Sequence, residues 1–449
     1  MLEKNSIYFV NHASILLKGE SKGLLTDPWY WGDCFNKGWL LLYNNTDNEI
    51  ITILKATKAI WISHEHPDHF SVPFYLKFGN LIKNLKIKIY FQRTKDKRLI
   101  NFLIKNGFCV IEVKEGQEII LEENFSFRVV KSEFYDSALI AKINNKIIFN
   151  LNDCPLHDKE EISSFKSRFG PCDILLTQFS YAAWKGGSKN KKWRITAAKE
   201  KLNAMYLQSK ILEAKILIPF ASFIRFANAE NLYLNDAINT PKKVLNFFTS
   251  KKVSTNCCFM KPLDFLNLNS FNNSLNLDAV RFWEKKFSRI SELNPIHFLN
   301  SNSLDDVEKN FKIYTERVRR NNSWILMFLL QKVRLGSFFK PTIIRLSDLD
   351  CNIYIDLVSE DIHITNKIPD ITMHSQSLIF IFQHPFGFDT LTINGCFHVK
   401  SFSSFQNFTK TFAIENLNNL GYRLSLSLFF RLDLIFLFFS RLKKVRGQM

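Results

Sequence analysis

The sequence lacks the cysteine spacing on which disulfide-rich proteins depend. Its eight cysteines form no Cys-x-x-Cys pair and follow no regular framework. This pattern argues against a disulfide scaffold and favours a reducing compartment. The chain also opens without a basic segment followed by an apolar stretch, the signature of a leader peptide, so we expect a cytoplasmic protein.

No apolar run is long enough to span a membrane. The most apolar stretch, 424–446, is interrupted by Arg431 and Asp433, and each remaining run falls short of the roughly 20 residues that a spanning helix needs. The stretch ends in a basic segment, 441–446. It predicts an apolar C-terminal helix, either packed on the second domain or in peripheral contact with an anionic membrane.

Acidic residues are in the minority, since 60 Lys and Arg oppose 42 Asp and Glu and give a net charge of +18. Such an excess favours polyanionic partners. No nucleic-acid motif or dense basic helix accompanies it, and part of the charge gathers in the loop 185–194 and the tail 441–446. The sequence therefore predicts an anionic small molecule or membrane face as partner, and no nucleic acid.

The order of apolar runs predicts an α/β domain over 1–270 and an α+β domain over 271–449. Hydrophobic residues make up 46% and charged residues 23%, which is typical of a folded globular protein. An Asn/Ser/Leu-rich stretch, 267–276, is interpreted as a linker. Strands are predicted at 14–18, 51–54, 58–63, 87–91, 117–121, 126–130, 138–142, 146–150, 173–177, 215–219 and through 341–400, and helices at 194–212, 279–290, 305–334 and 401–446.

One run carries a dense set of metal ligands. His64, His66, Asp68 and His69 lie within six residues, directly after the apolar strand that ends at Ile62. At a strand end these side chains converge on a small volume, and neutral imidazole is the commonest ligand for zinc or iron. The run therefore predicts a metal site.

This His-x-His-x-Asp-His run resembles the ligand motif of the metallo-β-lactamase fold. The resemblance implies an αββα sandwich in which His64 and His66 bind one metal while Asp68 and His69 bind a second. It also implies a later bridging aspartate, for which Asp153 is the best candidate because it again follows an apolar strand. Asp68 and Asp153 are the expected catalytic carboxylates, since such groups orient a metal-activated water.

Further motifs resemble the non-Rieske part of cytidine monophosphate-N-acetylneuraminate hydroxylase-like proteins, a family of amino-sugar hydroxylases. The resemblance covers roughly 7–265 and implies a metal-dependent enzyme that modifies an N-acetylated, nucleotide-linked amino sugar in cell-surface glycan biosynthesis. The motifs occur in the family's order: Thr26-Asp27-Pro28-Trp29, Gly38-Trp39, Tyr135-Asp136-Ser137, Asn152-Asp153-Cys154 and Ile218-Pro219-Phe220-Ala221.

The Rieske module of that family has no counterpart in this sequence. Its [2Fe–2S] signature is a Cys-x-His pair followed by a Cys-x-x-His pair, and the sequence contains no such succession. An oxygenase of this kind would therefore take its electrons from a separate Rieske or ferredoxin chain.

The metal shell implied by the resemblance is incomplete. No histidine occurs from 70 to 156 or from 158 to 296, where the fold expects two more ligands. His12 is expected to cap or pack near the site rather than bind metal. Oxygen ligands in place of nitrogen favour iron or manganese over zinc, so one or two divalent ions, zinc or iron, are expected. The substitute ligands are sought among Asp136, Glu133 and Asn239.

Substrate-binding residues are predicted around the basic, glycine-containing loop 185–194. Glycines and a helix N-terminus favour phosphate binding, so Lys185 and Arg194 are candidates, with Trp184 to stack on a sugar or base and Arg225 to clamp an anion. A solvated basic loop is the open alternative.

Three functions stay open. The first is the amino-sugar hydroxylase, because two histidines and a carboxylate also make a non-haem iron oxygenase site. The second is a metal-dependent hydrolase of an amide or phosphoester. The third is a non-catalytic, substrate-binding subunit for a separate Rieske oxygenase. In the second domain, 370–395 resembles the strand–turn–strand of sterol-carrier-like modules.

Overall fold

The computed structural model describes residues 2–132, 136–270, 276–299, 301–332 and 338–425. The chain divides into two compact units, Met1–Pro295 and Ile296–Met449, whereas the sequence placed the boundary at 270/271. Helix α7 (Leu277–Ser288) belongs to the first unit. Its Trp283 stacks on Phe223 with ring centroids 4.0 Å apart.

One seven-stranded sheet of the first unit contains the predicted strands on both sides of the metal-ligand run. The order is β17-β1-β2-β3-β6-β7-β8, and β3, β6, β7 and β8 are parallel. Three helices, α1 (Asp47–Lys55), α2 (Val72–Asn84) and α3 (Arg98–Lys105), pack on one face. The strands are β1 Ser6–Asn11, β2 Ser14–Lys18, β3 Gly23–Thr26, β6 Thr57–Ile62, β7 Lys88–Gln92, β8 Cys109–Val113 and β17 Phe265–Asn267.

A second seven-stranded sheet has the order β16-β14-β13-β12-β11-β10-β9. Helix α4 (Lys159–Phe169) packs on it through Phe165, whose ring centroid lies 5.5 Å from that of Phe149. Helix α5 (Lys191–Ile211) contacts both α4 and β13. The strands are β9 Glu118–Glu122, β10 Phe125–Lys131, β11 Ser137–Ile143, β12 Lys146–Asn152, β13 Ile174–Gln178, β14 Ile216–Phe220 and β16 Asn256–Cys257.

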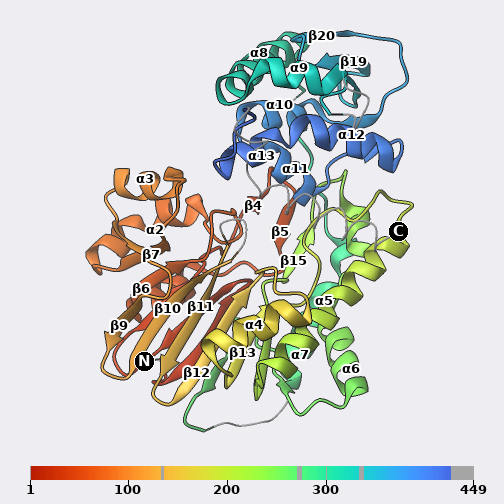
Figure 1. Ribbon diagram of the computed structural model, residues 1–449. Coiled ribbons are helices and arrows are strands. Elements are labelled where there is room, and N and C mark those ends of the chain that lie inside the picture. The colour runs from red at the N-terminus through yellow and green to blue at the C-terminus, as the bar shows by residue number, and fades with distance from the viewer. Residues whose placement is uncertain (1, 133–135, 271–275, 300, 333–337, 426–449) are drawn as a thin grey trace. The chain divides into compact units, whose positions relative to one another are not determined.

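The two sheets face each other and form the predicted αββα sandwich (Figure 1). Successive strand residues point to opposite faces, so Ile60 and Ile62 pack under the helices while Trp61, fully buried, points to the opposite face. Tyr90 of β7 and Phe127 of β10 meet between the sheets, with ring centroids 5.3 Å apart. The fold prediction is confirmed.

The metal-ligand run leaves β6 and Asp153 leaves β12, and both strands have parallel neighbours. Carboxyl ends of parallel strands share one edge of a sheet, which is where α/β folds place ligands. A small three-stranded sheet of β4 (Asp33–Cys34), β5 (Trp39–Leu41) and β15 (Ile224–Phe226) adds Phe35, whose ring lies 5.6 Å from that of His66.

One strand prediction in this unit is wrong, because 51–54 lies inside helix α1. The β-branched residues there favour a strand. A capping box overrides them: the Thr46 side chain accepts the backbone N–H of Glu49, and the Glu49 side chain accepts that of Thr46. The other strand predictions between 14 and 219 overlap observed strands, and helix 194–212 corresponds to α5.

The second unit combines helices with a five-stranded sheet of order β20-β19-β18-β21-β22, in agreement with the predicted α+β class. The helices are α8 Leu304–Asn321, α9 Trp324–Lys332, α10 Ser375–Gln383, α11 Gly387–Asn394, α12 Phe402–Phe412 and α13 Ile414–Asn419. The strands are β18 Thr342–Leu346, β19 Cys351–Asp356, β20 Asp361–Ile364, β21 Ile371–Met373 and β22 His398–Val399.

Strands were predicted through 341–400, but 375–394 forms α10 and α11. The His374 side chain accepts the backbone N–H of Gln376 and starts α10, so the apolar residues that suggested a strand build a buried helix. Gly387 is required where α11 begins, because a Cβ there would lie 2.5 Å from the carbonyl oxygen of Phe380. The expected C-terminal helix, 424–446, lies almost wholly outside the described residues. Within the described parts of the chain, no helix is both long and apolar enough to cross a membrane.

Candidate metal centre

The loop after β6 brings its histidines together at the carboxyl edge of the first sheet. The backbone N–H groups of His69 and Phe70 both donate to the carbonyl oxygen of His66, at 2.9 and 2.7 Å, and close a tight turn. His64 and His69 are almost fully buried. His64 Nε2 lies 2.9 Å from His66 Nδ1, within hydrogen-bonding distance, so these two ring nitrogens are adjacent.

Asp153 joins this group from the second sheet. Its Oδ2 lies 3.8 Å from His64 Nε2 and 3.8 Å from His69 Nε2. The ligand atoms of these three residues all lie within 4.8 Å of one another, close enough to hold a metal ion. The structure therefore brings the predicted bridging carboxylate to both halves of the histidine run.

The residues predicted to replace the missing histidine ligands differ in how close they lie to the site. Asp136 Oδ1 lies 3.8 Å from His64 Nδ1, at the start of β11. Asn239 is turned away from the two metal-ligand groups, because its Nδ2 donates to the carbonyl oxygens of Phe179 and Ala198, both at 2.8 Å. Glu133 lies outside the described residues.

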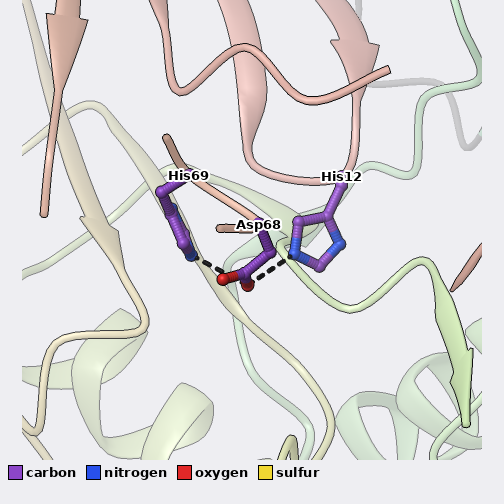
Figure 2. A group of neighbouring side chains, drawn as sticks. All are labelled: His12, Asp68 and His69. Carbon is purple, nitrogen blue, oxygen red and sulfur yellow. Dashed lines mark hydrogen bonds and ion pairs between the residues drawn. The ribbon is translucent and has the colours of Figure 1, made fainter. Parts of the chain in front are cut away.

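A second ligand group was not predicted in full. Figure 2 shows the Asp68 carboxylate between the rings of His12 and His69. Asp68 Oδ2 lies 3.3 Å from His12 Nε2 and 3.1 Å from His69 Nε2, and the ligand atoms of the three residues again lie within 4.8 Å of one another. His12 precedes the histidine run by more than fifty residues, so local spacing could not reveal it.

A polar layer beneath the site orients His69. Asp27 Oδ2 lies 3.1 Å from His69 Nδ1, and it also accepts 2.8 Å hydrogen bonds from Ser63 Oγ and Asn152 Nδ2. A carboxylate on Nδ1 keeps the proton there and leaves Nε2 as the lone-pair donor to a metal. Asp27 and Asn152 adopt left-handed backbone, with φ of +36° and +56°. Such strain concentrates at functional sites.

The charges of the site favour a cation. Burial, and then the charge of Asp153, raise the pKa of Asp136 well above its ordinary value. Burial also opposes ionisation of Asp68, but His69 and the hydrogen bond from His12 outweigh it and hold the pKa of Asp68 well below its ordinary value. Carboxylates crowded in this way repel one another, and a bound cation relieves that repulsion.

The buried oxygens of the site fit a metal. Asp68 Oδ1 and Asp153 Oδ1 are buried and have no hydrogen-bond partner within the described chain. An unsatisfied buried carboxylate oxygen is costly, and metal coordination is a standard way to satisfy one. Together with three imidazoles, these oxygens make a mixed nitrogen and oxygen donor set suited to zinc or iron.

Arg194 is not available as the substrate ligand that the sequence suggested. It is fully buried, and its Nε and Nη2 donate to the two carboxylate oxygens of Asp236, both at 2.7 Å. Its Nη1 donates to the carbonyl oxygen of Gly187 at 2.6 Å. The side chain therefore holds the glycine loop in place from beneath.

The other three predicted substrate-binding residues, Trp184, Arg225 and Lys185, differ in burial and in contacts. Trp184 is buried with its ring 5.5 Å from that of Trp193, and Arg225 is buried with Nη2 donating to the carbonyl oxygen of Asn294 at 2.9 Å. Lys185 is half-buried.

Lys201 of α5 was not predicted as a site residue from the sequence. Burial lowers its pKa to about 8, although the charges of Asp153 and Asp136 act in the opposite direction.

The two halves of a Rieske signature are present, but in reverse order. Cys154-x-x-His157 comes first in the sequence, and Cys396-x-His398 follows far later. A Rieske site needs the Cys-x-His pair before a nearby Cys-x-x-His pair. The reversed order gives no such site.

No family model matches the chain. Among curated proteins it is similar to cytidine monophosphate-N-acetylneuraminic acid hydroxylase of Danio rerio, 23% identical over 294 residues that cover 61% of this chain and 48% of that protein. The Xenopus laevis hydroxylase is 24% identical over 250 residues, covering 51% and 40%. The human protein, described as inactive, is 24% identical over 260 residues, covering 54% and 50%. The chain thus spans about half the length of these relatives.

Among solved structures, the diiron β-hydroxylase CmlA from Streptomyces venezuelae has a TM-score of 0.40 at 14% identity, covering 60% of this chain and 55% of that one. The metallo-β-lactamase fold protein YhfI from Bacillus subtilis has a TM-score of 0.40 at 12% identity, covering 58% and 98%.

Two facing sheets covered by helices surround a buried group of histidines and carboxylates at the strand ends, and the sequence relatives are hydroxylases. The first unit therefore combines an αββα sandwich with buried residues that could hold a metal ion, and it is similar in sequence to the cytidine monophosphate-N-acetylneuraminic acid hydroxylases.

Proposed function

We propose that this protein hydroxylates an N-acetylated, nucleotide-linked amino sugar used in cell-surface glycans, in the cytoplasm and with electrons from a separate Rieske or ferredoxin protein. The observation that supports this most is the approach of His64, His66 and Asp153, because His66 Nδ1 lies 2.9 Å and Asp153 Oδ2 lies 3.8 Å from His64 Nε2. Two imidazoles and a carboxylate are the donor set of non-haem iron oxygenases, and the sequence relatives are hydroxylases of such a sugar.

In this proposal one oxygen atom of O₂ enters a C–H bond of the sugar. The other leaves as water, with two electrons from the donor protein and two protons. Iron held here supplies the redox chemistry when bound. Within the described chain, Asp68 and Asp153 would hold the ion through their buried, unpartnered Oδ1 atoms, and Asp27 keeps His69 in one orientation.

The substrate's phosphate is proposed to lie toward Lys185 and Lys201. Both are cations with lowered pKa values, chiefly because of burial, and the charge of Lys185 acts on Lys201. A pair of partly buried cations without an acidic hydrogen-bond partner within the described chain is a favourable place for a phosphate. This arrangement replaces Arg194 in the substrate-binding set.

Metal analysis and turnover test the proposal together. The full chain is loaded anaerobically with Fe(II), then given the cytidine monophosphate-linked sugar, O₂ and a reduced ferredoxin. A product heavier by one oxygen atom, lost in His66→Ala and kept in the exposed-site control His157→Ala, is the expected result. Failure of the wild-type chain to bind any metal would overturn it.

Hydrolysis is the second candidate, because it needs no electron donor and the sequence holds no Rieske signature. The zinc-loaded chain would then cleave an amide or phosphoester, with Asp68 or Asp153 orienting the attacking water. Zinc-dependent cleavage of such substrates, with no oxygenated product from the iron form, would establish the hydrolase in place of the hydroxylase.

A further inference from the structure

His12 stands at the turn between β1 and β2, and its backbone is held in an unfavourable conformation. Its φ is +36°, a left-handed conformation that few non-glycine residues adopt, although histidine adopts it more often than most. The turn is held by two hydrogen bonds: the N–H of His12 donates to Asn11 Oδ1 at 2.9 Å, and its carbonyl oxygen accepts the N–H of Ala221 at 2.8 Å. Backbone strain that the surrounding structure maintains is found most often at functional sites.

The direction of the His12 ring indicates its functional role. His12 is 2% exposed, and the Trp29 ring packs edge-on against it at 5.4 Å. Its Nε2 faces Asp68 Oδ2 at 3.3 Å, and His69 Nε2 faces the same oxygen at 3.1 Å. Figure 2 shows the two rings approaching the carboxylate from opposite sides.

We infer that His12 is a metal ligand, which completes a second ion site with Asp68 and His69. His69 Nδ1 is taken up by Asp27, so His69 has only Nε2 to offer. The site takes a divalent transition-metal ion of the iron, manganese or zinc class, since its donors are two imidazole nitrogens and one carboxylate.

This assignment supplies one of the two nitrogen ligands that the sequence lacks. No histidine occurs from 158 to 296, so the first unit has none in the region where the fold expects its last ligand. His12 supplies that nitrogen from the first hairpin instead. His64 and His66 are left for the other ion, with Asp153, which lies 3.8 Å from both His64 and His69, placed between the two.

The competing role is a purely orienting one, in which His12 donates a hydrogen bond to Asp68 and touches no metal. The two roles predict different results when metal binding to a His12 variant is measured. Loss of an orienting residue next to a ligand lowers metal affinity by roughly 10–100-fold and leaves the set of ligands unchanged. Loss of a ligand removes one nitrogen from the metal.

The test uses His12→Asn, because asparagine tolerates left-handed backbone better than most residues, with His157→Asn as the matched exposed control. Each full-length chain is loaded with Co(II), and two quantities are measured: bound metal per chain, and the number of paramagnetically shifted imidazole N–H signals in the proton NMR spectrum. The wild type should show shifted signals from His12, His64, His66 and His69. His12→Asn should lose one such signal, together with one ion or more than a hundredfold of its affinity.

Two results would overturn the inference. One is a wild-type spectrum in which His12 gives no shifted signal, a measurement that does not depend on the variant folding. The other is a variant that keeps the same shifted signals and metal content, whether or not its affinity falls by roughly tenfold. The inference rests on the proposed function only in needing a metal. A chain that binds metal through His12 but turns over no sugar would refute the function and leave the ligand assignment standing.

Discussion

Asp27 and His69 are joined on the side of the imidazole ring that faces away from the other ligands: Asp27 Oδ2 lies 3.1 Å from His69 Nδ1, while His69 Nε2 lies 3.1 Å from Asp68 Oδ2. One ring thus connects a buried polar layer to the metal centre. The same Asp27 carboxylate accepts the N–H and the hydroxyl of Ser63, at 2.7 and 2.8 Å. The orientation of a metal ligand and the end of strand β6 therefore depend on one side chain.

Replacing Asp27 with asparagine should weaken metal binding. The amide nitrogen of the introduced side chain cannot accept a hydrogen bond, so at least one of the donors that converge on this position loses its acceptor, at a cost of about 1–3 kcal/mol. We expect Asp27→Asn to lower metal affinity by roughly 10–100-fold, measured by competition with a chelator. Asp47→Asn, in an exposed ion pair with Lys77, is the control and should bind metal like the wild type. Equal affinities in both variants would contradict the orienting role of Asp27.

Metal binding should release protons, and metal affinity should rise with pH. Burial lowers the pKa of His69, but Asp68, Asp153 and Asp27 outweigh it, so its pKa lies well above the ordinary histidine value. The pKa of Asp136 is raised as well, by burial and by Asp153. Both groups therefore keep their protons to a higher pH than their ordinary pKa values would allow, and a metal ion that binds to them must displace those protons. His64 differs, because burial holds its pKa well below the ordinary value.

Titration calorimetry in two buffers of different ionisation enthalpy measures this proton release directly. Asp136→Asn should release fewer protons than the wild type on binding the same ion. A heat of binding that is identical in both buffers would show that His69 and Asp136 are already deprotonated, and would contradict the expected pH dependence.

The sequence predicted most strands and the ligand run well, because both are local patterns, and the sandwich was predicted from the resemblance of that run to the metallo-β-lactamase motif. Apolar strands ended by polar residues could be located one at a time, and the strand end at Ile62 placed His64 to His69 on an edge of the sheet. The prediction failed where a local preference was overruled, as at 51–54, where the capping box of Thr46 and Glu49 starts a helix. His12 was expected only to cap or pack near the site, and the contacts of His12 and Asp27 with the ligands could not be predicted, because both residues are distant in sequence and meet the ligands only through the fold.

Arg194 was predicted to bind substrate, and the structure gives it a structural task that can be tested. Removing one partner of a fully buried ion pair costs about 3–5 kcal/mol; Asp236 is partly exposed, so Arg194→Met should lower the free energy of unfolding by less than that amount, measured by urea denaturation. Arg281→Met, in an ion pair with Asp278 on an exposed helix surface, should change it by less than about 1 kcal/mol. A variant at Arg194 that is fully stable and has lost only substrate affinity would restore the original interpretation.

Lys201 should make the binding of an anionic substrate depend on pH. Burial lowers its pKa to about 8, and bound metal ions would lower it further because they repel the charged ammonium. The charge on Lys201 is therefore present below its pKa and lost above it, so in the metal-loaded enzyme the KM for a phosphate-bearing sugar should rise with pH at a point below about 8. Lys201→Arg should keep its charge and remove this rise, since arginine stays protonated throughout. Lys201→Met should bind weakly at every pH, whereas Lys199→Met, exposed on the same helix, should behave like the wild type. A rise in KM that persists unchanged in Lys201→Arg would assign the titration to another group.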